Sequence, residues 1–163
     1  MSYETVTFKL SFSVDPQGVA RAFAAFLRHG PTVAAKHKGA FDYWHASLHR
    51  DLVRKTRNEL WFQFRVPQGS AVQLRQRFEL DLAGTAGGLG FISLATVVQD
   101  EVKAFARVIA QTGGTASMDA LWPQVQTATE WAIADLLIGT ERQTPAKWHP
   151  WTRHIYRNLL GLE

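Results

Sequence analysis

Residues 5–14, TVTFKLSFSV, constrain the fold more than any other stretch, because apolar and polar side chains alternate there without a fault. The apolar positions are the even-numbered ones from Val6 to Val14. A period of two is that of a β-strand with one buried face and one polar face. The chain therefore needs apolar cover for one face of a sheet, and the rest of the sequence has to supply it.

Helical patterns provide that cover. Asp15 and Pro16 predict the start of a helix that ends at Gly30-Pro31, since aspartate caps a helix and proline is favoured in its first turn. Apolar side chains that recur every three or four positions predict further helices. These helices cover residues 42–57, 91–110, 119–139 and 151–160.

A β-hairpin is predicted around Pro67-Gln68-Gly69, because residues 60–66 and 72–82 alternate on either side of it. The register for a three-residue turn places Trp61 opposite Arg75, a cation–π pair worth about 0.5–1 kcal/mol if exposed. With residues 5–14 the hairpin forms an antiparallel three-stranded sheet. About five helices cover one face of this sheet, so the predicted fold class is a two-layer α+β domain.

The composition indicates one globular domain that spans residues 1–163. The side chains are 46% hydrophobic and 20% charged, and a chain of this length can bury roughly 70% of its unfolded surface. The absence of cysteine excludes disulfides, thiolate metal sites and cysteine nucleophiles. No signal-peptide pattern opens the sequence, so we expect a cytoplasmic protein.

The uncharged stretch 82–99 resembles a membrane span in length, but four glycines and several polar residues dilute it, so we expect none. Its glycines at positions 84, 87, 88 and 90 fit neither the dinucleotide-binding pattern nor the phosphate-binding loop that ends in lysine. The sequence therefore predicts no cofactor.

The charge is distributed unevenly. The net charge is +4, but residues 1–80 carry 12 basic and 6 acidic side chains, whereas residues 81–140 carry 2 and 6. Such an asymmetry favours an anionic partner for the first half of the chain, either nucleic acid or an acidic protein.

Arginines near two aromatic side chains form the candidate binding surface. The predicted helix 42–57 groups three of them beside Tyr43, and the polar face of the predicted sheet adds three more beside Trp61 and Lys9. Arginine binds phosphates and aromatic rings stack on bases, so we expect a non-enzymatic nucleic-acid-binding protein, with RNA foremost. The alternative is an ordinary solvated face. The predicted nucleic-acid-binding residues are Tyr43, Arg50, Arg54, Arg57, Trp61, Arg65, Arg75 and Arg77.

An enzymatic alternative is a small metal-independent phosphodiesterase or ribonuclease that uses histidine as acid and base. Arg142 and His149, with six residues between them, are similar in spacing to the Arg-x(4–6)-His motif of HEPN-like ribonucleases. Pro145 and Pro150 interrupt the continuous helix on which that family carries the motif. The weak catalytic candidates are His45, His49, His149, His154 and Arg142.

His45 and His49 also have the i, i+4 spacing with which a helix can present two metal ligands. No zinc-binding spacing supplies further ligands, so we expect no metal site.

A third hypothesis makes the chain a subunit of a larger protein complex, with Trp61, Trp148 and Trp151 as buried anchors. The competing interpretation is that Trp148 and Trp151 dock the C-terminal segment onto the body of the same chain.

Overall fold

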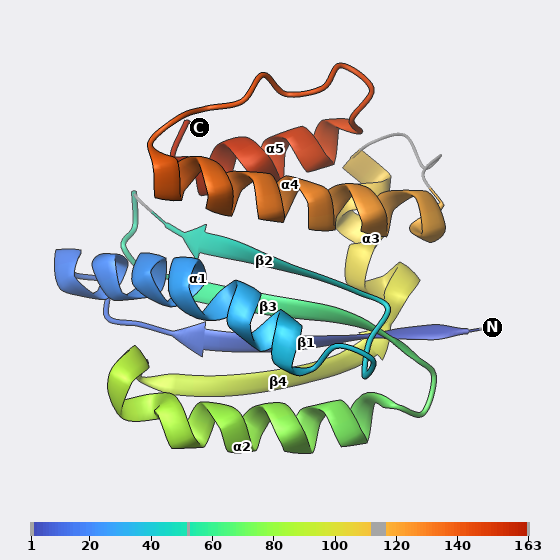
Figure 1. Cartoon of the computed structure of the whole chain (residues 1–163), viewed down its shortest axis with the longest axis horizontal. Helices are drawn as coiled ribbons and strands as arrows, with labels where there is room; N and C mark the ends of the chain where they lie inside the picture. The colour runs from blue at the N-terminus through green and yellow to red at the C-terminus, as the bar shows by residue number, and fades with distance from the viewer. Residues whose placement is uncertain (1, 52, 112–116, 163) are drawn as a thin grey trace.

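The computed structural model, which describes residues 2–51, 53–111 and 117–162, shows an α+β fold with a four-stranded antiparallel sheet and five helices (Figure 1). The strands are β1 (Tyr3–Ser11), β2 (Tyr43–Arg50), β3 (Asn58–Pro67) and β4 (Ser93–Asp100). The helices are α1 (Pro16–Lys36), α2 (Ala71–Leu89), α3 (Glu101–Gln111), α4 (Met118–Ile138) and α5 (Pro150–Leu159). The predicted α+β class is confirmed, and the sheet has one strand more than predicted.

The strands are ordered β2-β3-β1-β4, so β1 and β3 lie in the middle of the sheet. From β1 to β4 the chain runs strand, helix, strand, strand, helix, strand, which is the split βαβ connectivity known as ferredoxin-like. Helices α1 and α2 pack on the same face of the sheet, since Phe78 of α2 contacts Phe8 and Phe62 and Gly30 of α1 lies next to Phe62. Figure 1 shows α1 in front of the strands, α2 alongside β4, and α4 with α5 beyond the β2 edge. Helices α4 and α5 therefore extend the helical layer past the β2 edge.

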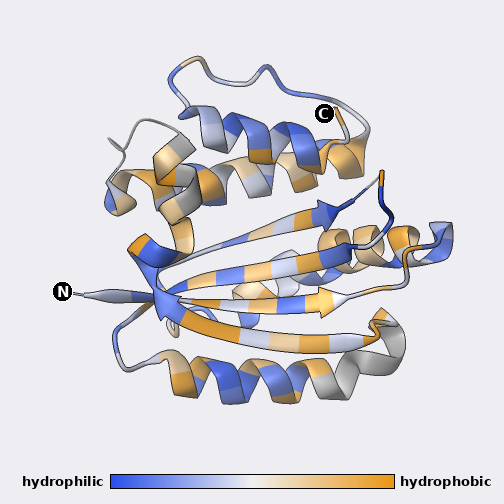
Figure 2. Cartoon of the chain, turned by 180° about the vertical axis from the view of Figure 1, so that it is seen from behind, coloured by the Kyte–Doolittle hydropathy of each residue, from blue (hydrophilic) through white to orange (hydrophobic). Residues whose placement is uncertain are grey.

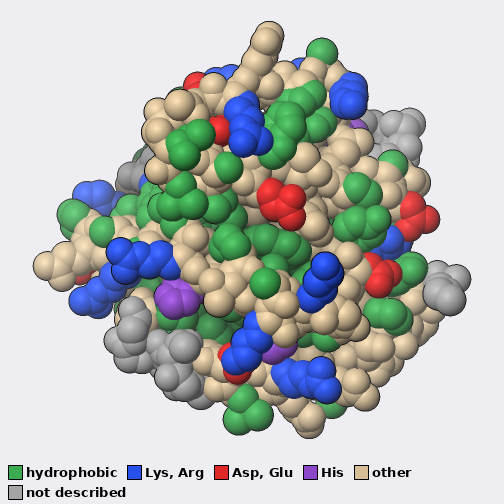
Figure 3. Space-filling model, in the orientation of Figure 1, with side chains coloured by type: hydrophobic (Ala, Val, Ile, Leu, Met, Phe, Trp, Pro, Cys, Tyr) green, Lys and Arg blue, Asp and Glu red, His purple; other side chains and the backbone are tan. Residues whose placement is uncertain are grey.

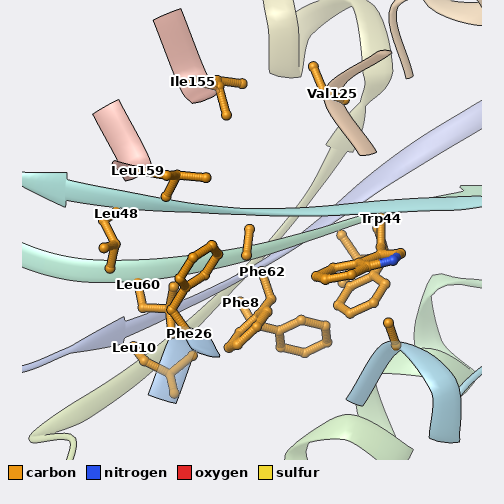
Figure 4. Packing of buried hydrophobic residues seen from close by; sticks show 14 of the residues in the cluster. Phe8, Leu10, Phe26, Trp44, Leu48, Leu60, Phe62, Val125, Ile155 and Leu159 are labelled. Carbon is orange, nitrogen blue, oxygen red and sulfur yellow. The ribbon is translucent and has the colours of Figure 1, made fainter. Parts of the chain in front are cut away.

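The alternating segment 5–14 behaves as predicted over the length of β1. Val6, Phe8 and Leu10 are each 0% exposed and point to the helix side of the sheet. Phe8 stacks on Phe78 of α2 with ring centroids 3.9 Å apart. Figure 4 shows the apolar core that these strands share with α1, α4 and α5. This burial of apolar surface is the main favourable contribution to folding.

The predicted helix 42–57 is wrong: the segment forms β2 followed by the turn to β3. Trp44 and Leu48 are buried, as predicted, but so is Ala46 between them. Positions four apart share a face in a helix and in a strand alike, whereas position 46 faces the core only in a strand.

The predicted strand 72–82 is also wrong, because the segment forms α2. Its buried residues are spaced by three and four, as in a helix: Ala71, Leu74, Phe78 and Leu82. Val72 and Leu80, which a strand would turn inward, are 62% and 74% exposed. The hairpin of the structure joins β2 to β3 instead.

The predicted helix 91–110 divides into β4 and α3 at Asp100. The Asp100 carboxylate accepts hydrogen bonds from the backbone of Val102 and Lys103, as the cap of a helix does. The first helix continues through Gly30-Pro31 to Lys36 instead of ending there. The predicted cap at Asp15 and the helices 119–139 and 151–160 are confirmed.

Two glycines of α1 give a matched test of this packing. A Cβ at Gly18 would lie 1.9 Å from the carbonyl oxygen of Ser13, whereas a Cβ at Gly30 would meet Phe62 and Trp44 at ordinary distances of 3.6 and 3.7 Å. We expect Gly18→Ala to lower the free energy of unfolding by about 1–2 kcal/mol through overpacking. Gly30→Ala should raise it by up to about 1 kcal/mol, because alanine favours the helix. Urea denaturation of both variants measures the difference, and equal effects would contradict the packing.

Candidate nucleic-acid interface

The face of the sheet opposite α1 and α2 carries the polar side chains of the strands (Figure 2). At one end α3 and the start of α4 cover this face, and the rings of Phe105 and Trp122 lie 6.1 and 5.7 Å from that of His45. At the other end the strand side chains are only partly buried. The residues of this open end are Lys9, Ser47, His49, Glu59 and Trp61.

Trp61 occupies the centre of the open end. Its neighbours across the sheet are Lys9 on β1 and Ser47 on β2. The ammonium of Lys9 lies 4.1 Å from the centre of the indole ring, and the His49 ring stacks on the indole at 3.8 Å. Lysine, indole and imidazole therefore form one row across three strands. The cation–π partner of Trp61 is Lys9, so the predicted pairing with Arg75 is wrong.

Glu59 links this row to the turn between β2 and β3. Its Oε2 accepts a hydrogen bond of 2.8 Å from the Trp61 indole and lies 3.8 Å from Nε of Arg57. The turn itself is shaped by Asp51, whose carboxylate accepts from the backbone of Val53 and Arg54. Those hydrogen bonds hold the pKa of Asp51 below its usual range, the bond from Arg54 most of all. Asp51 therefore holds the backbone of Val53 and Arg54 in place within the turn.

A small hollow of about 90 Å³ lies at the base of the turn. Arg50, Lys55 and Arg57 line it together with Asp51. Val14 and Val19 also line it, so the hollow lies on the α1 side of the turn and not on the open end. Arg50 also lies over the ring of Phe23 on α1, 5.0 Å from its centre. Three cations against one carboxylate make the hollow suitable for a small anion such as a phosphate group.

The predicted arginines do not gather on one surface. Arg54 and Arg57 lie in the turn between β2 and β3, and Arg57 contacts Glu59 of the open end. Arg50, at the end of β2, lies over Phe23 of α1 on the other face of the sheet. Arg75 and Arg77 belong to α2, which covers the opposite face of the sheet, and Arg75 pairs with Glu79 at 2.9 Å. A single ligand at the open end therefore has only part of the predicted set within reach.

Arg65 is neutralised inside the protein. Its side chain is 5% exposed and forms ion pairs with Glu101 at 2.8 Å and Asp119 at 2.6 Å. The guanidinium also lies 3.8 Å from the centre of the Tyr3 ring. This arrangement ties β3 to α3 and α4 and leaves Arg65 a structural role.

The two histidines of β2 have different surroundings. His45 is 2% exposed, and neither ring nitrogen forms a hydrogen bond of normal geometry with the described residues. Burial, reinforced by His49, lowers the pKa of His45 to about 3. Burial and the nearby Arg57 lower the pKa of His49 to about 4. Both imidazoles are therefore neutral at physiological pH, and His45 is sealed from substrate.

The candidate residues near the C-terminus serve its packing. Arg142 pairs with the buried Asp135 at 3.2 Å. Nδ1 of His149 accepts from the backbone of Trp151 at the start of α5, and the His154 ring lies 5.5 Å from that of Trp151. None of these contacts joins them to the β2 histidines. Among the described residues, no group of three or more histidine or acidic side chains is placed to hold a metal ion.

Trp148 lies inside the chain. It is 6% exposed and packs against Trp131 and Tyr156 with ring centroids 5.0 and 5.7 Å away. The predicted docking of the C-terminal segment is confirmed for Trp148. Trp61 is more accessible than Trp148.

A groove of about 980 Å³ lies between the second half of α1, the start of β2 and the middle of α4. Figure 3 shows hydrophobic side chains in the region between α1 and α4. Tyr43, predicted to bind nucleic acid, lines this groove and not the open end. No local sequence pattern indicates the groove, because its walls come from segments far apart in the chain.

Comparison of the chain with models of protein families, with curated proteins and with solved structures found no match. Within the described ranges, no helix combines the length and apolarity that crossing a bilayer requires.

Proposed function

We propose that this chain is a non-enzymatic binding protein for single-stranded nucleic acid, with RNA foremost, and that the open end and the β2–β3 turn form its binding surface. The observation that carries the proposal is the row of Lys9, Trp61 and His49, joined through Glu59 to the basic turn. Four-stranded sheets of this connectivity can present aromatic rings on an uncovered face, where unpaired bases stack. Here one tryptophan and one stacked histidine are available.

Binding would exchange one ring contact for another. The ammonium of Lys9 lies over the Trp61 ring. An exposed cation–π contact is worth about 0.5–1 kcal/mol, and base stacking on an aromatic ring about 1–3 kcal/mol. A base can therefore replace the ammonium on the indole with a net gain, and the released Lys9 can then approach a phosphate.

The backbone of the same nucleotide would lie over the turn. Arg57 and the Trp61 indole contact the same oxygen of Glu59, so the phosphate of a nucleotide stacked on the ring can reach Arg57, with Arg54 in the same turn. Together with Lys9, these arginines supply three cations. Three phosphate-neutralising cations correspond to a slope of about −2 in the logarithm of the binding constant against the logarithm of salt concentration. The Glu59 carboxylate opposes this binding, because it repels phosphate and occupies Arg57.

Fluorescence anisotropy with labelled oligouridylate and oligodeoxythymidylate at low salt tests the proposal. We expect Trp61→Ala to weaken binding by roughly 1–3 kcal/mol through loss of stacking. Arg54→Ala combined with Arg57→Ala should weaken binding and flatten the salt dependence. Glu59→Gln should strengthen binding, because it removes the repulsion and keeps a side chain of the same shape.

Arg75→Ala combined with Arg77→Ala is the matched control. It also removes two positive charges, but from α2, on the opposite side of the sheet. In both double variants one of the two arginines is paired with a glutamate, Arg75 with Glu79 and Arg57 with Glu59. We expect its effect on affinity to be much smaller than that of the pair at positions 54 and 57. Absence of binding at low salt, or equal losses in the two double variants, would overturn the proposal.

A further inference from the structure

The groove between α1, β2 and α4 is separate from the open end and has a different chemical character. Its walls come from Pro31 to Gly39 on the α1 side, Phe41 to Trp44 around the start of β2, and Gln126 to Ile133 on α4. Its volume of about 980 Å³ is at the upper end of the range of small-molecule sites.

Apolar and aromatic side chains form much of the lining. Trp44 is 5% exposed and backs onto Gly30 of α1, and Ile133 is 5% exposed on the α4 side. Tyr3, Phe41 and Tyr43 add three further rings. Aromatic faces carry partial negative charge, so such a lining favours a flat apolar body or a cation.

The charged groups of the groove favour a cation. Asp42 and Glu130 line it opposite a single lysine, Lys38. Arg65 also lines it, but Glu101 and Asp119 already neutralise that guanidinium. Lys38 has no acidic partner among the ion pairs of the described residues. The lining therefore has two carboxylates and only one cation of this kind.

Both carboxylates are held in place by neighbouring polar groups. Glu130 accepts a hydrogen bond of 3.0 Å from Gln126, and the Gln126 carbonyl accepts one of 3.1 Å from the backbone of Trp44. Asp42 accepts from the Tyr3 hydroxyl, and this hydrogen bond raises the pKa of Tyr3. The backbone of Asp42 is anchored on Arg65, whose carbonyl accepts its N–H at 2.9 Å.

We propose that this groove binds a small organic cation, a protonated amine carried on a flat apolar body. The body packs against Trp44, Phe41 and Ile133, and the ammonium lies between Asp42 and Glu130, next to the tyrosine rings. Both carboxylates are exposed, so the ammonium pairs with them at the mouth of the groove while the apolar body lies deeper. The proposal does not depend on nucleic-acid binding, since no residue of the open end lines the groove.

Three indole compounds that differ in one group test the charge preference by isothermal titration calorimetry: tryptamine, tryptophol and indole-3-acetate. They carry a cation, a neutral hydroxyl and an anion on the same ring system. We expect tryptamine to bind up to about fivefold more tightly than tryptophol, the ratio for an ion pair with exposed carboxylates. Indole-3-acetate should bind most weakly.

Variants of the lining separate this site from nonspecific binding of indole. Asp42→Asn and Glu130→Gln keep the hydrogen-bond acceptors, so they should weaken tryptamine binding by up to about fivefold and leave tryptophol unchanged. Lys38→Gln removes the competing cation and should strengthen tryptamine binding. Thermal melting of each variant checks the fold. No tryptamine binding at millimolar concentration, equal binding of the acetate, or unchanged affinity in the Asp42 and Glu130 variants would overturn the proposal.

Discussion

Replacement of Asp135 by alanine is expected to lower the free energy of unfolding by about 3 kcal/mol, because it removes the acceptor of several buried hydrogen bonds. The Asp135 side chain is 0% exposed. Its Oδ2 accepts from the Tyr156 hydroxyl at 2.5 Å and from the backbone N–H of Arg142 at 2.9 Å. Without the carboxylate, the buried tyrosine hydroxyl loses its strongest partner and α5 loses its tie to α4. Chemical denaturation at neutral pH measures the change.

Two milder variants locate the effect. Tyr156→Phe and Asp135→Asn each remove part of the network and should cost about 1–2 kcal/mol. Burial and the Asp135 carboxylate together raise the pKa of Tyr156 to about 12. Ultraviolet titration of Asp135→Asn should therefore show a lower pKa for this tyrosine. If Asp135→Ala unfolds with the midpoint of the wild-type protein, the network contributes nothing to docking α5.

The fold could be predicted only where one period fitted the sequence. Residues 5–14 alternate at every position, and only a strand explains that. In three other segments the clearest apolar pairs are four apart: Trp44 and Leu48, Leu74 and Phe78, Leu94 and Val98. A spacing of four satisfies a helix and a strand equally, so the position between each pair decides, and tertiary packing determines whether it is buried.

The candidate interface could be predicted in part for a related reason. Arg57 and Trp61 are close in sequence, so they meet at Glu59 despite the wrong helix prediction for residues 42–57. Arg65 could not be judged from its own segment. The carboxylates that neutralise it come from residues 36 and 54 positions later, and such long-range pairs leave no local pattern.

The stability of the protein is expected to fall as the pH drops below about 6.5, because the folded state cannot protonate His45. Burial between aromatic rings lowers its pKa from 6.5 to about 3. Below pH 6.5 the unfolded chain therefore binds a proton at this histidine, whereas the folded chain does not until the pH approaches 3. This histidine contributes no pH dependence above that range. Between pH 6.5 and about pH 4.5 it should cost about 2 kcal/mol, and His49, which is less buried, adds to the loss.

The substitution His45→Leu tests this, because leucine is similar in size and has no ring nitrogens to leave unbonded. We expect the variant to be more stable than wild type by about 1–2 kcal/mol at neutral pH, since burying unpaired polar groups is costly. Its stability should also fall less between neutral pH and about pH 4.5. Carboxylates with lowered pKa values, such as Asp51, Asp81 and Glu79, lose most of their contribution below their ordinary values of 3.8 to 4.5, so histidine dominates the change in this window. His154→Gln, at an exposed position, controls for the loss of one histidine. A variant at position 45 with the same pH dependence as wild type would show that the folded protein protonates His45 freely.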